Sequence, residues 1–177
     1  MIDCKVTGEQ IKYAEDLVNR CNFGRRGRGD GNREQQFVGV LGQTVVADLL
    51  NLERPKGGEG FDGGYDVKIN DKKVDIKTMG RTVPMQEHYV HNFVGYQVGY
   101  DVDYLIFCSF NKTNNILTVC GYISKSDFLK KADFYEEGAI RTRDNGTNFK
   151  TKAPLYEICQ KDLHPINRIE DIFNGIR

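Results

Sequence analysis

The sequence predicts a mixed α/β (α+β) protein in which a central mixed β-sheet is flanked by helices. Three observations support this fold class. Apolar residues recur at helical spacing in two segments before residue 52, and polar and apolar residues alternate between residues 65 and 77. Beyond residue 100, two apolar runs precede a short amphipathic segment. The order helix, helix, hairpin, strand, strand, helix, strand is typical of a mixed sheet with helices packed on it.

Length and composition narrow the domain organisation and the class of protein. We expect residues 1–177 to form a single domain, because a chain of this length buries roughly two-thirds of its unfolded surface around one core. The 25 basic and 25 acidic residues cancel, so any attraction to nucleic acid must come from a local basic surface. Five widely spaced cysteines without a C-x-x-C pair argue against a disulfide framework or a zinc site, and we interpret them as reduced and mostly buried. Without a long apolar run, a soluble, cytoplasmic protein with no membrane contact is expected.

The N-terminal third predicts two helices separated by a loop. The first is expected at residues 7–21, because Thr7 and Gln10 form a capping-box pattern ahead of helix-spaced apolar residues. Residues 24–33 combine four glycines with four arginines, which predicts a mobile basic loop. A longer helix should then run from Glu34 to about Asn51.

A β-hairpin is predicted at residues 65–69 and 73–77, after a glycine-rich connector. Asn70 and Asp71 form its turn, so paired residues have numbers that sum to 141. This register places Asp66 directly across from Asp75, and the two-residue period places Lys77 on the same face. The side chains expected to point to the opposite face, into the core, are Val67, Ile69, Val74 and Ile76.

The remaining chain predicts smaller elements, while residues 80–99 give no clear assignment. The expected elements are strands at 104–110 and 116–122, a short helix opened by Ser124, a polar segment at 136–152, a strand at 155–158 and a terminal helix after Pro165.

Two opposed carboxylates beside an amine suggest a site for a hard divalent cation. Like charges directly opposite each other destabilise an antiparallel pair, so Asp66 and Asp75 need compensation. Mg²⁺ is commonly held by one or two carboxylates together with waters and substrate phosphate oxygens. The same residues also fit a solvated face with a surface ion pair, which contributes ~0–1 kcal/mol.

The segment from Gly64 to Thr78, preceded by an amphipathic helix, resembles the PD-(D/E)XK nuclease superfamily, which has the restriction-endonuclease-like fold. The resemblance covers roughly residues 33–166. It implies that Asp66 and Asp75 are metal ligands, that Lys77 is the catalytic lysine, and that the carbonyl of Ile76 is a further ligand. The implied activity is Mg²⁺-dependent hydrolysis of DNA phosphodiesters, with Mn²⁺ as a possible substitute, DNA as partner and a homodimer as a possible assembly.

One residue departs from the family pattern. Members often have Gly-Glu in the helix before the hairpin, whereas this chain has Gly42-Gln43. Gln43 can accept a contact through its carbonyl but brings no charge, and Glu34 or Asp62 are alternative contributors. The departure keeps two other readings open: a catalytically weak or inactive DNA-binding or assembly protein with the nuclease fold, and an interaction module whose aspartates grip a basic partner.

Other candidate residues lie outside the hairpin. The residues expected to contact nucleic acid are Arg25, Arg26, Arg28, Arg33 and Arg81. A second, weaker basic group comprises Arg141, Arg143, Lys150 and Lys152. We interpret His88 and His91 as a loop pair rather than metal ligands, and Tyr89, Phe93, Tyr96 and Tyr100 as packing residues rather than base-stacking surfaces. Neither a G-K-[ST] phosphate loop nor a G-x-S-x-G motif occurs, so no nucleotide cofactor is expected.

Overall fold

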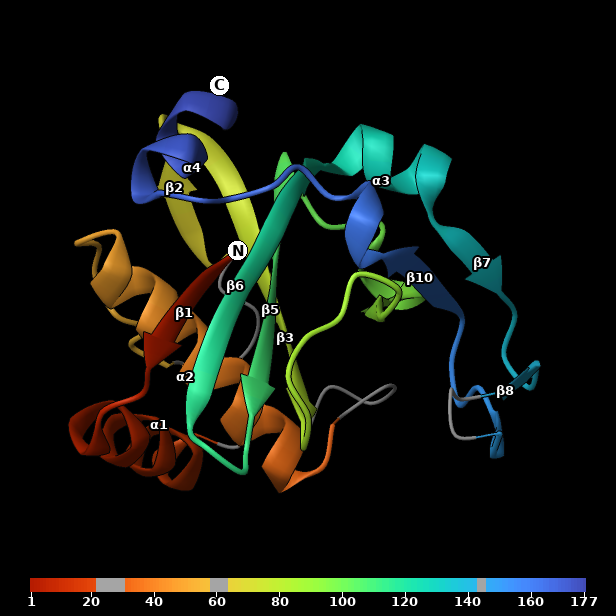
Figure 1. Ribbon diagram of the computed structural model, residues 1–177, viewed down its shortest axis with the longest axis horizontal. Coiled ribbons are helices and arrows are strands. Elements are labelled where there is room, and N and C mark those ends of the chain that lie inside the picture. The colour runs from red at the N-terminus through yellow and green to blue at the C-terminus, as the bar shows by residue number, and fades with distance from the viewer. Residues whose placement is uncertain (22–30, 58–63, 143–145) are drawn as a thin grey trace.

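The computed structural model describes residues 1–21, 31–57, 64–142 and 146–177 (Figure 1). Its main sheet has five strands in the order β1-β6-β5-β3-β2. These strands are β1 (Ile2–Lys5), β2 (Val67–Ile69), β3 (Lys72–Arg81), β5 (Tyr104–Asn111) and β6 (Ile116–Ser124). Only the β3–β5 pair is parallel among them. The predicted mixed α/β class is therefore confirmed.

Smaller elements surround this sheet. A three-stranded antiparallel sheet has the order β4-β10-β7, formed by β4 (Val90–Val94), β10 (Leu155–Cys159) and β7 (Asp133–Tyr135). The two-stranded pair consists of β8 (Ile140–Thr142) and β9 (Asn148–Lys150). The helices are α1 (Gly8–Arg20), α2 (Arg33–Leu49), α3 (Lys125–Lys131) and α4 (Ile169–Gly175), with 3₁₀ turns η1 (Gly95–Gln97) and η2 (Gln160–Asp162).

Side-chain caps fix the starts of three helices. The predicted capping box of α1 is present, with reciprocal bonds between Thr7 and Gln10. Asn32 caps α2 in the same way through Gln35, so this helix starts at Arg33, one residue earlier than predicted. Ser124 caps α3 as predicted. Local sequence signals thus set these helix starts to within a residue or two.

The main sheet is covered on both faces. Figure 1 shows α1 and α2 on one side of it, and α3, β10 and β7 on the other. The first core cluster joins both helices to sheet residues such as Val74, Ile76 and Ile106. The second lies on the opposite face, where Leu105 and Phe107 of β5 meet the small sheet and α3. Alternate residues of β3 and β5 therefore face two different cores.

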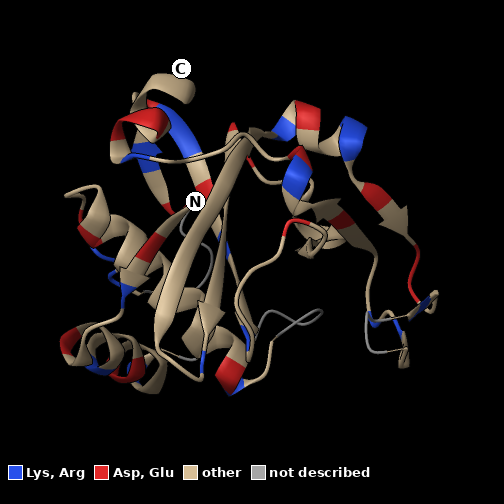
Figure 2. Ribbon diagram, viewed as in Figure 1, with Lys and Arg blue, Asp and Glu red and all other residues tan. Residues whose placement is uncertain are grey.

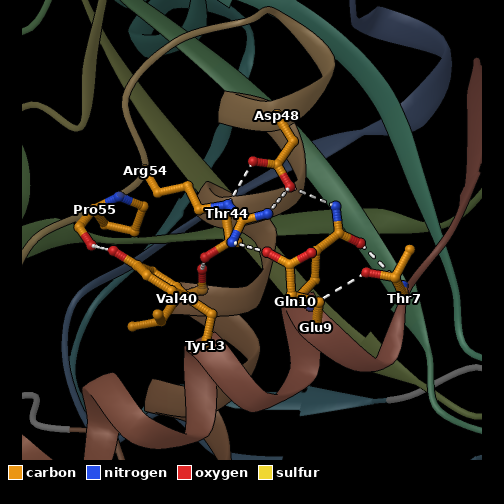
Figure 3. Close-up of polar contacts among 9 residues, drawn as sticks. All are labelled: Thr7, Glu9, Gln10, Tyr13, Val40, Thr44, Asp48, Arg54 and Pro55. Carbon is orange, nitrogen blue, oxygen red and sulfur yellow. Dashed lines mark hydrogen bonds and ion pairs between the residues drawn. The ribbon is translucent and has the colours of Figure 1, made fainter.

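A polar network joins α1 to α2 and to the chain that leaves α2 (Figure 3). Arg54 donates to Asp48 at 2.6 and 2.8 Å and to Glu9 of α1 at 2.9 Å. The hydroxyl of Tyr13 donates to the carbonyl of Pro55 at 2.7 Å. The Arg54 hydrogen bond is the main cause that lowers the pKa of Asp48. This network fixes α2, which carries Gln43, relative to the chain that leads towards the hairpin.

Several expectations need correction or refinement. The unassigned residues 80–99 contain the end of β3, all of β4 and η1, and β1 was not predicted. All five cysteines are free, as expected, but only Cys108 and Cys120 are fully buried. None of the helices in the described ranges is both long enough and apolar enough to cross a membrane.

Candidate metal centre

The predicted hairpin is present in the predicted register. Val67 pairs with Val74 and Ile69 with Lys72, so the numbers of paired residues sum to 141. Asn70 and Asp71 both have positive φ, at 50° and 62°, which is typical of a type I′ turn. This turn matches the twist of the two strands, and it fixes which residues share a face.

Asp66 lies just before β2, where the regular pairing ends, so the predicted position of Asp66 directly across from Asp75 is not part of the observed register. Its amide donates to the carbonyl of Val74 at 2.9 Å, although Val74 is already the partner of Val67. Its carboxylate accepts a bond from the amide of Ile76 at 2.7 Å. The side chain is thus anchored to the central part of β3 by a backbone donor.

Asp75 and Lys77 lie on the face of β3 that meets the second core. Asp75 is only 4% exposed, and its carboxylate forms an ion pair with the Lys77 ammonium at 2.7 Å. The ammonium also lies 5.6 Å from the centre of the Phe93 ring on β4. The reading of these residues as a solvated face is therefore wrong, because Asp75 is buried and β4 of the small sheet packs against this side of β3.

The two carboxyl groups influence each other strongly. Burial, followed by the charge of Asp75, raises the pKa of Asp66 well above its ordinary value. Lys77 and the Ile76 amide act in the opposite direction. One amine therefore stands beside two neighbouring carboxyl groups in a poorly hydrated position, which favours an additional cation there.

Gln43 contacts this pair from α2. Its amide nitrogen donates to the Oδ1 atom of Asp66 at 2.7 Å. Gly42 makes the approach possible, because a Cβ atom at that position would lie 1.8 Å from the hydroxyl oxygen of Thr78 on β3. The sequence allowed Gln43 either to accept a contact through its carbonyl or to be a plain polar residue of the helix. Instead it faces the site as a donor that holds Asp66.

The residues present fit a Mg²⁺ ion of the kind that retains several waters. Asp66 and Asp75 supply carboxylate oxygens. The Ile76 amide donates to Asp66, and the amide and carbonyl of one strand residue point to the same side, so the Ile76 carbonyl faces the same region. Nowhere in the described ranges do three or more His, Cys, Asp or Glu side chains gather to hold a metal. Two carboxylates with waters and substrate oxygens match the usual magnesium environment.

The alternative acidic contributors do not join this group. Glu34 lies at the start of α2 and forms an ion pair with Lys112 instead. Nine residues of helix, about 13 Å, separate it from Gln43. Asp62 lies outside the described residues.

The expected nucleic-acid contacts are only partly described. Arg25, Arg26 and Arg28 lie outside the described residues, as does most of the expected loop at 24–33. Arg33 is exposed at the start of α2. Arg81 ends β3, where its guanidinium donates to the carbonyl of Val90 at 2.6 Å and lies over the ring of Tyr89. None of these contacts brings Arg33 or Arg81 to the carboxylates.

The weaker basic group is only partly described. Arg141 forms an ion pair with the buried Glu157 at 2.5 Å and lies over the ring of Tyr135. Lys150 and Lys152 are exposed, while Arg143 lies outside the described residues. Arg141 therefore attaches β8 to the small sheet.

The interpretation of His88 and His91 as a loop pair is wrong for His91. This residue belongs to β4, is fully buried and is hydrogen-bonded to Gln160 at 2.7 Å. Among the aromatic residues of this region, Phe93 is buried in the second core, as the packing interpretation expected, whereas Tyr96 is 38% exposed.

Sequence reasoning missed the burial of Asp75 and the donor role of Gln43. The face of Asp75 and Lys77 is covered by β4, which lies in the stretch of residues 80–99 that gave no clear assignment. The close approach of α2 and β3 had one available signal, a glycine at position 42 on the helix face that carries apolar residues. Comparisons of the chain with protein-family models, curated proteins and solved structures found no significant match.

Proposed function

We propose that this protein is a Mg²⁺-dependent deoxyribonuclease that hydrolyses DNA phosphodiester bonds at the Asp66–Asp75 pair. The observation that carries the proposal is the convergence of two carboxylates and one lysine in a largely buried position, on a hairpin of defined register. The restriction-endonuclease-like fold belongs to this proposal. Its support is the resemblance of residues 64–78 and the placement of Gln43 beside Asp66.

Each residue has a role that follows from its contacts. Asp66 and Asp75, with the Ile76 carbonyl, would hold the ion, for which Mn²⁺ is an alternative. Bound there, Mg²⁺ would supply Lewis-acid stabilisation of charge on the phosphodiester and acidify a water. Lys77 orients the Asp75 carboxylate and presents its ammonium towards charge that develops on the phosphate. Gln43 holds Asp66 in place through its amide.

The substitution Asp75→Ala tests the proposal. We expect Mg²⁺-dependent cleavage of linear, circular, nicked and branched DNA by the parent protein, and a loss of at least about 100-fold in the variant, because a metal ligand is removed. Gel analysis of the products would also distinguish endonuclease from exonuclease action.

Asp71→Asn is the matched control. Asp71 lies in the turn of the same hairpin, is exposed, and has a positive φ that asparagine tolerates. The Asp71→Asn protein should cleave DNA like the parent. Equal cleavage by Asp75→Ala and the parent would contradict the proposal.

A second candidate function is DNA binding without cleavage. Gln43 favours it, because a neutral donor stands next to Asp66 where the resembled family often has an acid. Isothermal titration with Mg²⁺ and Mn²⁺ separates the two candidates. A nuclease should bind metal in a manner that depends on Asp66, whereas a binding protein should bind DNA with no such metal dependence.

A further inference from the structure

The face of the hairpin that carries Asp75 also carries a pair of lysines two residues closer to the turn. Lys68 of β2 pairs directly with Lys73 of β3. Opposed residues have Cβ atoms about 4.5–5.5 Å apart, and like charges in this position are unfavourable. Because side chains alternate between faces, Lys73 and Asp75 share a face and lie about 7 Å apart along β3.

The ring of Tyr65 lies close to both amines. The ammonium groups of Lys68 and Lys73 lie 5.8 and 5.7 Å from its centre. Tyr65 directly precedes Asp66 in the chain, so the ring holds this positive charge beside the candidate metal centre. We name Tyr65, Lys68 and Lys73 the lysine rung.

The positive charge of the lysine rung is only partly neutralised. Lys73 forms an ion pair with Asp101, whose side chain is 77% exposed, and such surface pairs contribute little; the carboxylate of Asp103, which accepts from the backbone amide of Lys73 at 2.8 Å, is the second nearby negative charge. Lys68 is exposed, and no ion pair joins it to a carboxylate within the part of the chain that the structure describes. Figure 2 shows a basic stretch on this hairpin directly before an acidic one.

We infer that the lysine rung binds a backbone phosphate of DNA next to the phosphodiester held at the Asp66–Asp75 pair. The inference rests on the proposed function. Two adjacent amines attract the single negative charge of a backbone phosphate and release its counterions on binding. A rung spacing of about 7 Å allows neighbouring phosphates of one strand to reach the lysines and the carboxylate centre together. The contact is to backbone, so it predicts affinity without base preference.

The test measures DNA binding without metal. Fluorescence anisotropy in EDTA, with a labelled duplex and a labelled single strand across a range of KCl concentrations, gives the affinity and its salt slope. In Lys68→Ala/Lys73→Ala we expect the slope of log K against log [KCl] to become shallower by about 1, because one phosphate contact is lost, and binding at low salt to weaken about tenfold.

Lys72→Ala is the matched control, because Lys72 lies on the same strand with its side chain directed to the opposite face. It should keep the salt slope of the parent. Equal losses in the control and the double variant, or no loss in the double variant, would overturn the inference. Thermal unfolding of each variant shows whether a loss reflects misfolding, and Lys68→Arg/Lys73→Arg should restore the slope.

Cleavage measured in parallel with Mg²⁺ separates this inference from the proposed function. Binding that depends on the lysine rung, without cleavage by the parent, would leave the phosphate subsite intact and reject the nuclease. Cleavage and a salt slope that are both insensitive to Lys68 and Lys73 would reject the subsite and keep the nuclease.

Discussion

The contact between Gln43 and Asp66 adds a hydrogen-bond donor to the candidate centre and leaves its charge unchanged. Asp66, Asp75 and Lys77 together carry at most one net negative charge, and the Gln43 amide adds a donor without adding charge. Such an arrangement limits the repulsion between carboxylates before metal binds. It also provides one anionic ligand fewer than a centre with a glutamate at position 43 would have.

Gln43→Glu should increase the repulsion between carboxylates in the absence of metal and add an anionic ligand when metal is present. A carboxylate in place of the amide loses the 2.7 Å hydrogen bond and stands against Asp66, so we expect the free energy of unfolding in EDTA to fall by about 1–3 kcal/mol. With Mg²⁺ the third carboxylate becomes a potential ligand, and the stabilisation by saturating metal should exceed that of the parent. Thermal unfolding with and without Mg²⁺ measures both effects.

Gln35→Glu controls for added negative charge on the same helix. Gln35 occupies the capping-box position of α2, where glutamate serves equally well, so this variant should unfold like the parent and respond to Mg²⁺ like the parent. A Gln43→Glu protein that gains no additional stabilisation from Mg²⁺ would argue against metal binding at Asp66.

At the scale of elements, the close approach of α2 to β3 brings Gln43 to the hairpin. We expect Gly42→Ala to destabilise the protein by about 1–3 kcal/mol, because the added methyl group overlaps Thr78 and must push the helix away. The shift should also lengthen the Gln43–Asp66 contact and weaken Mg²⁺ binding. Chemical denaturation and isothermal titration check the two effects.

Gly39→Ala is the control in the same helix. A Cβ atom at Gly39 would meet no atom within 4 Å, so alanine should stabilise α2 by about 0.5–1 kcal/mol through its better helix propensity. If both glycine variants were equally stable, close packing at Gly42 would not be what positions the helix.

The hairpin and the helix starts could be predicted because their causes are local. The Asn70–Asp71 turn fixes the register, and Thr7 and Ser124 supply caps within the next turn of helix. Strand β4 could not be predicted in this way. It places a polar residue, His91, in the interior and pairs with β10, which lies more than 60 residues later.

The candidate site was predictable only in part for the same reason. The two-residue period of β3 alone placed Asp75 and Lys77 on one face. In sequence this face resembles a solvated one, because its polar residues alternate with the apolar residues of the opposite face. This face is covered by Phe93 of β4, which with β10 and α3 forms a second layer over the main sheet, and no local pattern on the hairpin indicates this cover.

At the scale of the whole molecule, this second layer depends on His91. Its imidazole packs against Phe107 of the main sheet and is bonded to Gln160, whose amide donates to the carbonyl of Cys120 at 2.9 Å. His91 thus ties the small sheet to β6 through a buried chain of polar groups. The Nδ1 atom has no hydrogen-bond partner in the described structure, so a second proton there would create a buried, unpaired charge.

This environment predicts a loss of stability in acid. Burial is the main cause that lowers the pKa of His91 from 6.5 to about 4. The unfolded chain therefore takes up this proton first as the pH falls, and the free energy of unfolding falls by up to about 3 kcal/mol between pH 6.5 and pH 4, with no contribution from this group above that window.

His91→Gln keeps a donor for Gln160 and should remove this part of the pH dependence, whereas His88→Gln, at an exposed position, should retain the slope of the parent. Urea unfolding at pH 7, 6, 5 and 4 measures the slopes. Parallel curves for the parent and His91→Gln would mean that His91 is not the group that couples acid to the loss of the second layer.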